Sequence, residues 1–197
     1  MATTFAGLRS KYSFLSDELW GQFSSLFERI EVPARTVLLH EGEVARKGYW
    51  IEQGCIRVWF SKQGRDTTFQ FFFEGQGISS IESFRKGIPS FFTVETVEPC
   101  VLYRIHKHHV DEIAAHPAMQ AHYNALLADF LFERQLYYMR EFLSFIRDSP
   151  AERYQRLLQE RPHILQRIPQ QYIASYLGIT SVSLSRIKAR FAREKKG

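Results

Sequence analysis

The side chains whose types and spacing best suit a chemical task lie between residues 170 and 190, in the stretch QQYIASYLGITSVSLSRIKAR. A guanidinium such as that of Arg186 can donate two parallel hydrogen bonds to the O6 and N7 atoms of guanine. Serine hydroxyls reach bases or phosphates, and Val182 could pack on the methyl group of thymine. Lysine and arginine side chains neutralise phosphates, and amide side chains at a helix start also meet them. We therefore predict a DNA-binding site at Gln170, Gln171, Ser181, Val182, Ser183, Ser185, Arg186, Lys188 and Arg190.

The same stretch has the spacing of a helix-turn-helix. Ala174 is small where two helices must cross closely, Gly178 suits a left-handed turn, and Thr180 can cap the second helix. Apolar residues that would face inward recur at helical spacing, namely Ile173, Leu177, Leu184, Ile187 and Phe191. The alternative is an ordinary helical hairpin, which would need none of the exposed basic side chains.

Positive charge is concentrated at the same end of the chain. The net charge is +5 over 197 residues, yet residues 150–197 alone hold ten basic and three acidic side chains, a net +7. Residues 1–149 are slightly acidic. A basic module on a near-neutral body is typical of a polyanion binder, and Arg193, Lys195 and Lys196 would add phosphate contacts. A solvated, charged surface helix is the plainer reading.

The elements that must position this module follow from periodicity. Residues 37–105 contain short β-rich runs separated by Gly42, Gly48, Gly54, Gly64, Gly75 and Gly87, which favours an antiparallel sandwich or roll. Before them, residues 16–30 have helical spacing, with Ser16 as the cap.

Residues 117–147 predict one long helix that begins at Pro117. Phe132, Leu136, Met139, Leu143 and Ile146 form one apolar stripe, and a second stripe begins at Leu126, Phe130 and Tyr137. A helix that is apolar on two faces needs two partners, and we expect the second to be the same helix of another copy. The alternative is one continuous intramolecular core. A further helix should start at Ser149, with Pro150 and Glu152 in a capping box, and end at Pro162.

Together these elements resemble the CRP/FNR transcription regulators. The stretch LLHEGEVARKGYWIEQGCIRVWF is similar to the family's cyclic-nucleotide-binding roll, and YIASYLGITSVSLSRIKARF is similar to its DNA-reading segment. The resemblance implies an α+β fold with an antiparallel β-roll sensor at 1–116, a dimerisation helix at 117–147 and a helix-turn-helix domain at 148–197. It also implies a homodimer on double-stranded DNA that contacts RNA polymerase. The chain stops soon after the motif, so we expect no C-terminal β-hairpin wing.

One departure concerns the effector. Ser79 and Ser80 stand where the family has Gly-Glu, and Ser90 and Phe91 stand where it has the phosphate-gripping arginine and its neighbour. Phe91 and Phe92 would crowd the pocket, and Arg85 could substitute only if its loop folded inward. We therefore predict no response to cAMP or cGMP, and either a vestigial pocket or one for an unidentified small, apolar effector. Its candidate lining is Ser79, Ser80, Ile81, Glu82, Arg85, Ser90 and Phe91.

Other chemistry is poorly represented. Cys55 and Cys100 are too few for an iron–sulfur cluster and favour reduced thiols in the cytoplasm. The His-rich run at 106–109 is read as a surface turn rather than a metal site. Nucleotide-binding and hydrolase fingerprints are missing, as is any apolar run long enough to cross a membrane, so we expect neither an enzyme nor a membrane protein. The alternative function is a small-ligand sensor that acts through protein contacts, with DNA binding weak or lost.

Overall fold

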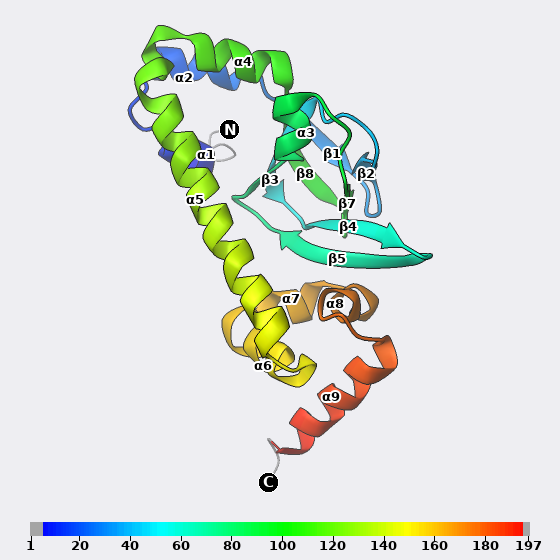
Figure 1. Cartoon of the computed structure of the whole chain (residues 1–197). Helices are drawn as coiled ribbons and strands as arrows, with labels where there is room; N and C mark the ends of the chain where they lie inside the picture. The colour runs from blue at the N-terminus through cyan, green and yellow to red at the C-terminus, as the bar shows by residue number, and fades with distance from the viewer. Residues whose placement is uncertain (1–5, 195–197) are drawn as a thin grey trace. The chain divides into compact units, whose positions relative to one another are not determined.

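The computed structural model describes residues 6–194 and divides into two compact units. The first contains the residues up to 60 together with 70–126, and the second contains 61–69 and the residues from 127 onward. Figure 1 labels the elements, with the strands in blue to green and the C-terminal helices in yellow to red. Each unit is described by itself below.

Within residues 6–194, eight strands form two antiparallel four-stranded sheets, as the spacing of the β-rich runs predicted. One sheet has the order β1-β8-β3-β6 and the other the order β2-β7-β4-β5. The strands are β1 (Glu28–Val32), β2 (Val37–Leu39), β3 (Lys47–Gln53), β4 (Ile56–Lys62), β5 (Arg65–Phe72), β6 (Gly77–Ile78), β7 (Thr93–Thr96) and β8 (Cys100–His106).

Apolar side chains from both sheets form the core of this β-roll. Ile51 of β3 and Leu102 of β8 are fully buried, and so are Ile56 and Val58 of β4. Strands rich in β-branched and aromatic residues are favoured because such side chains pack well on a pleated surface. Gly48 was predicted at a turn but lies inside β3, where it pairs with Ile105 of β8. The pairing of β3 with β8 therefore overrides the local turn preference of this glycine.

Short helices complete the first unit: α1 (Ala6–Lys11), α2 (Asp17–Ser24), α3 (Ile81–Lys86), α4 (Lys107–Ala115) and the first third of α5 (Pro117–Arg147). Ser16 caps α2 by accepting a hydrogen bond from the Leu19 amide, as predicted. The predicted helix over 16–30 is too long, because α2 ends at Ser24 and residues 28–32 pair with β8 instead. Long-range strand pairing thus wins over helical periodicity in this segment.

The second unit is helical. The C-terminal part of α5 leads to α6 (Pro150–Glu160), α7 (Pro162–Arg167), α8 (Gln170–Tyr176) and α9 (Ser181–Glu194). The capping box of Ser149 and Glu152 is present, with Pro150 at the first turn of α6, as predicted. The short helix α7 begins at Pro162, where the sequence indicated only an end. Within residues 6–194, no helix is both long and apolar enough to cross a membrane.

Gly54 is the turn residue most tightly enclosed by its neighbours. Its φ is +106°, and a Cβ atom there would lie 2.5 Å from Cys100 Sγ and 2.8 Å from the Pro99 carbonyl oxygen. Gly75 has a similar φ of +77° but nothing within 4 Å of an added Cβ. Substituting alanine at each position therefore distinguishes the cost of backbone strain, expected at both, from the cost of a steric collision, expected only at Gly54.

We expect Gly54→Ala to lower the free energy of unfolding by about 3 kcal/mol or more, because both a left-handed backbone and a collision with β8 must be accommodated. Gly75→Ala, the matched control, should lower it by only about 1–2 kcal/mol because it meets strain without collision. Urea denaturation of both variants measures the difference. Equal losses would contradict the steric argument.

Candidate nucleic-acid interface and effector pocket

The turn between α8 and α9 is a Schellman motif centred on Gly178. The Ile179 amide donates to the Ala174 carbonyl and the Gly178 amide donates to the Ser175 carbonyl, both at 3.0 Å, while Gly178 has φ +69°. This pair of backbone hydrogen bonds ends a helix and redirects the chain. The inward residues are placed as predicted, with Ile173, Ala174, Leu177 and Leu184 all at 2% exposure or less.

Helix α9 begins with the predicted cap. The Ser183 amide donates to Thr180 Oγ1 at 3.1 Å, and the two hydroxyls lie 3.0 Å apart. Ser183 is therefore partly committed to its own helix start, which the sequence interpretation as a DNA contact did not foresee. Ser181, Val182, Ser185 and Arg186 are exposed on the same helix, with Val182 at 62%.

The other predicted DNA contacts differ in how exposed they are. Gln170 and Gln171 are exposed at the start of α8, and Arg190 is exposed on α9 with its guanidinium 5.5 Å from the Phe191 ring centre. Lys188 is half-buried. Arg193 is exposed in the last turn of α9. Lys195 and Lys196 lie outside the described residues.

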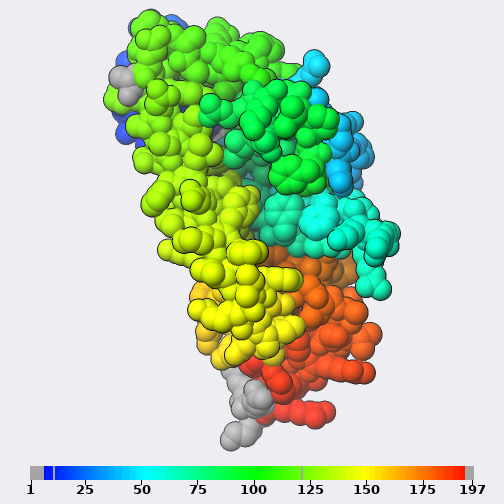
Figure 2. Space-filling view, viewed as in Figure 1, coloured from blue at the N-terminus to red at the C-terminus, as the bar shows by residue number. Residues whose placement is uncertain are grey.

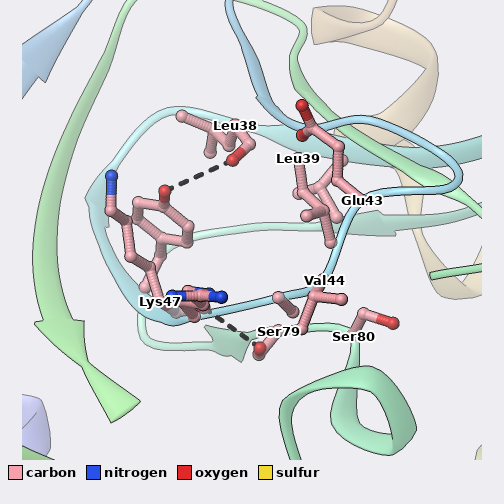
Figure 3. A pocket seen from close by; sticks show the side chains of 11 residues that line it. Leu38, Leu39, Glu43, Val44, Lys47, Ser79 and Ser80 are labelled. Carbon is pink, nitrogen blue, oxygen red and sulfur yellow. Dashed lines mark hydrogen bonds between the residues drawn. The ribbon is translucent and has the colours of Figure 1, made fainter. Parts of the chain in front are cut away.

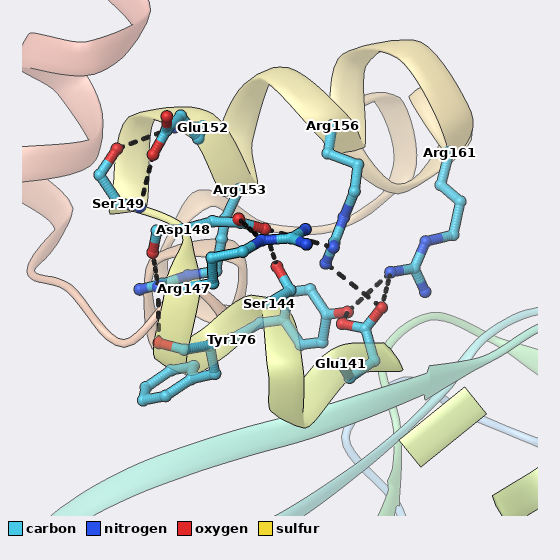
Figure 4. A network of polar contacts seen from close by, with 11 residues as sticks. Glu141, Ser144, Arg147, Asp148, Ser149, Glu152, Arg153, Arg156, Arg161 and Tyr176 are labelled. Atoms are coloured by element: carbon cyan, nitrogen blue, oxygen red, sulfur yellow. Dashed lines mark hydrogen bonds and ion pairs between the residues drawn. The ribbon is translucent and has the colours of Figure 1, made fainter. Parts of the chain in front are cut away.

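A polar network that the sequence did not reveal connects α5 to the following helices (Figure 4). The Glu141 carboxylate of α5 accepts hydrogen bonds from Arg161 at 2.9 Å and from the Tyr176 hydroxyl of α8. Arg161 also donates to the Tyr176 hydroxyl at 2.8 Å and to the Tyr137 hydroxyl at 3.2 Å. Burial raises the pKa of Tyr176, so its hydroxyl stays protonated and donates to Glu141.

The first unit contains a cavity of about 220 Å³ between its two sheets (Figure 3). Apolar walls come from Leu38, Leu39, Val44 and Val94, and polar groups from Glu43, Arg46, Lys47, Ser79 and Ser80. Cavities that hold drug-sized ligands measure about 300–1,000 Å³, so this one is small for a nucleotide. Ser79 and Ser80 line it as predicted, whereas Ile81, Glu82, Arg85, Ser90 and Phe91 do not.

The segment predicted to replace the phosphate-gripping pair satisfies its own polar groups. Ser90 Oγ lies 3.0 Å from Ser80 Oγ and 2.8 Å from the Phe92 carbonyl oxygen, and both serines are buried. Phe91 is 63% exposed, so the expectation that its ring crowds the pocket is wrong. Arg85 is exposed in the last turn of α3.

The charged groups buried in the roll are paired with each other. Arg57 of β4 donates from Nε and from a terminal nitrogen to Glu95 of β7, at 3.0 and 2.7 Å, and both residues are under 8% exposed. Arg57 also stacks over the Trp59 ring at 4.7 Å. Among the described residues, Arg57 is the only arginine buried to this degree, and a carboxylate already holds it.

The rings of three histidines lie close together at tilted angles. The rings of His108 and His109 are 4.0 Å apart, and His106 lies 5.6 Å from His108. Partial burial, together with the charges of Lys47 and Arg104, lowers the pKa of His106. Over residues 6–194, no group of three or more metal-ligating side chains is placed to hold an ion. Cys55 and Cys100 are buried thiols that do not form a disulfide.

Comparisons with known proteins agree with this geometry. Residues 29–116 match the family model of the cyclic nucleotide-binding domain. No curated protein sequence matches the chain. Among solved structures, the c-di-GMP responsive global regulator CLP of Xanthomonas campestris is 16% identical, with 91% of this chain and 93% of that chain covered and a TM-score of 0.71.

Two further structures have the same fold at similarly low identity. FixK2 of Bradyrhizobium japonicum is 16% identical, covers 86% of both chains and has a TM-score of 0.68. CooA of Carboxydothermus hydrogenoformans is 14% identical, with 98% of this chain and 86% of that chain covered and a TM-score of 0.69. Residues 29–116 thus match the cyclic nucleotide-binding domain model, and the chain shares the fold of solved CRP/FNR transcription regulators, as its sequence resemblance predicted.

Proposed function

We propose that this protein is a sequence-specific, DNA-binding transcription regulator of the CRP/FNR type that works as a homodimer. The observation that carries the proposal is the helix-turn-helix at 170–194. Its Schellman turn and buried inner face leave one side of α9 exposed. On that side, hydrogen-bonding, apolar and cationic side chains lie together at the start of a helix, which suits reading of base edges in the major groove.

The residues on α9 have distinct roles. Arg186 is exposed, lies in the second turn and reads guanine, while Ser181, Val182 and Ser185 contact neighbouring bases. Lys188, Arg190 and Arg193 neutralise phosphates, and Gln170 and Gln171 contact phosphate from the start of α8. The Ser183 amide donates to the Thr180 cap, and the Ser183 hydroxyl beside it contributes to binding from the first turn of α9.

The homodimer forms through α5. Phe132 is 60% exposed and Ile146 is 67% exposed, and Met139 and Leu143 between them are also exposed. Figure 2 shows this part of α5, in yellow-green, at the surface. Exposed apolar area of this kind is typical of an association surface, and a second copy of α5 would cover it.

The roll does not respond to cAMP or cGMP. A buried cyclic phosphate needs a buried cation, yet Arg57 is held by Glu95 and the Ser80–Ser90 pair is closed on itself. The cations that line the cavity are the exposed Arg46 and the half-buried Lys47, so neither offers the phosphate a buried charge. Desolvating the phosphate would cost several kcal/mol, and few new ion pairs or hydrogen bonds would offset that cost. A small effector that fits the 220 Å³ cavity, or none, is consistent with this geometry.

By family resemblance we expect RNA polymerase as a further partner, a cytoplasmic location and a function by binding rather than by catalysis. The second candidate is a sensor that acts through protein contacts. The exposed loop around Ile88 and Phe91 favours it to a small degree, because two apolar side chains lie there at the surface. The exposed α9 face favours DNA binding more strongly.

Arg186→Ala should weaken binding to the preferred operator by about 1–3 kcal/mol and relax the preference at one base position per half-site. Arg193→Ala, the control, should weaken binding to all sequences alike and flatten the dependence on salt. Selection from random DNA followed by titration at several salt concentrations measures both. Unchanged base discrimination in Arg186→Ala would refute the base-reading role.

Phe132→Glu should convert the dimer into monomers, because a carboxylate would have to be buried in the apolar seam. Leu131→Glu is the control, since its side chain points about 100° away around the helix. Sedimentation velocity at micromolar concentration distinguishes the two. A monomeric wild-type chain under these conditions would rule out the α5 dimer.

Millimolar cAMP or cGMP should leave the melting temperature and the DNA affinity unchanged. For comparison, a ligand of the folded state at one hundred times its dissociation constant would stabilise the protein by about 2.7 kcal/mol. A clear upward shift that disappears in Arg85→Ala would show instead that the phosphate site is rebuilt around that arginine.

A further inference from the structure

The helix-turn-helix is attached to the C-terminal part of α5 at two separate points within the second unit. One contact involves the Tyr176 side chain near the end of α8, and the other involves the carbonyl of the next residue, Leu177. We call them the Glu141 clamp (Tyr137, Glu141, Arg161 and Tyr176) and the Arg153 clamp (Phe145, Asp148, Arg153 and Leu177). Figure 4 shows Glu141, Arg153, Arg161 and Tyr176 around the end of α5.

The Glu141 clamp is a connected set of hydrogen bonds, to which Arg156 adds a longer contact of 3.5 Å with Glu141. Glu141 accepts from Arg161 and Tyr176, and Arg161 in turn donates to the hydroxyls of Tyr176 and Tyr137. Each of these groups is partly buried, and every hydroxyl has a partner. Because hydrogen bonds are directional and strengthen each other where water is scarce, such a network fixes an angle as well as a distance.

The Arg153 clamp joins the ends of two helices. The Arg153 guanidinium donates to the carbonyls of Asp148 at 2.6 Å, Leu177 at 2.8 Å and Phe145 at 3.3 Å. Carbonyls in the last turn of a helix lack partners within the helix and carry the negative end of its dipole, so one cation satisfies α5 and α8 together. The guanidinium also stacks on the Phe145 ring at 4.5 Å.

The stripe proposed to form the dimer seam lies on the same helix segment. Phe132, Met139 and Ile146 alternate along α5 with the residues of the Glu141 clamp, so seam and clamps occupy different faces of one rigid element. The path from the seam to the recognition helix therefore runs through α5, the two clamps, α8 and the Schellman turn. Each part of this path is a helix or is held by hydrogen bonds.

We propose that Glu141, Tyr176 and Arg153 are positioning residues that fix α9 relative to the dimer seam, so that the protein discriminates the distance between two operator half-sites. The proposal depends on the DNA-binding dimer proposed above. Adding one base pair moves a half-site by about 3.4 Å and rotates it by roughly 35°. Only a firmly held recognition helix loses its contacts on such a change, because a loosely held one would follow the displaced half-site.

The test uses the full chain and an operator selected from random DNA. The affinity is then measured for operators with half-sites one base pair closer, unchanged and one base pair farther apart. We expect the wild-type protein to lose about tenfold or more in affinity at the altered spacings. In the double variant Tyr176→Phe with Arg153→Met, the loss on altering the spacing should shrink to about threefold or less, together with weaker binding at the best spacing.

Ser149→Ala is the matched control, because it removes the α6 cap and destabilises the same unit without removing a hydrogen bond of either clamp. Its ratio of affinities between the best and the altered spacings should equal that of the wild-type protein, even where its melting temperature falls as far as that of the double variant. An unchanged ratio in the double variant, or the same change in Ser149→Ala, overturns the positioning role. Failure of the wild-type protein to select any sequence would overturn the DNA-binding function as well.

Discussion

The geometry of the C-terminal unit depends on the absence of a side chain at Gly178. The backbone there is left-handed, and an added Cβ would lie 3.0 Å from two atoms of the Phe145 ring. This lets the last turn of α5 lie directly against the turn of the motif. The Leu177 carbonyl that Arg153 binds directly precedes Gly178. The cap of α9, Thr180, follows two residues after Gly178. One small residue thus joins the long helix to the motif and sets where α9 begins.

The roll and helix α9 differ in where they place their cations. In the roll, Arg57 and Glu95 neutralise each other in the interior, and the serines near the cavity bond to each other or to backbone. These paired groups could bind an anionic ligand only by breaking existing bonds, and the cations at the cavity, Arg46 and Lys47, are not fully buried. On α9, by contrast, Arg186 is exposed to solvent. A polyanion can approach this surface without such a penalty.

Helix α5 has apolar residues on more than one face, and the polar clamps explain part of this arrangement. Tyr137 and Glu141 face the following helices and hold them by hydrogen bonds, whereas Phe132 and Met139 remain exposed. Polar contacts inside the unit and apolar contacts left outside it suit a helix with two tasks. Holding the following helices requires a fixed orientation, which directional hydrogen bonds provide. Associating with a second copy requires the burial of apolar area, which is not directional.

The sequence by itself determined the features that depend on residues close along the chain. The caps at Ser16, Ser149 and Thr180, the turn at Gly178 and the span of α5 all follow from local backbone preferences and helical periodicity. Only the tertiary structure decided the rest. Residues 28–30 continue a helical pattern but become β1 because β8 supplies a pairing edge, and Gly48 becomes a strand residue for the same reason. The Arg57–Glu95 pair and the Glu141 clamp join residues 15 to 38 positions apart, and the side-chain periodicities that reveal helices and strands carry no information about such partners.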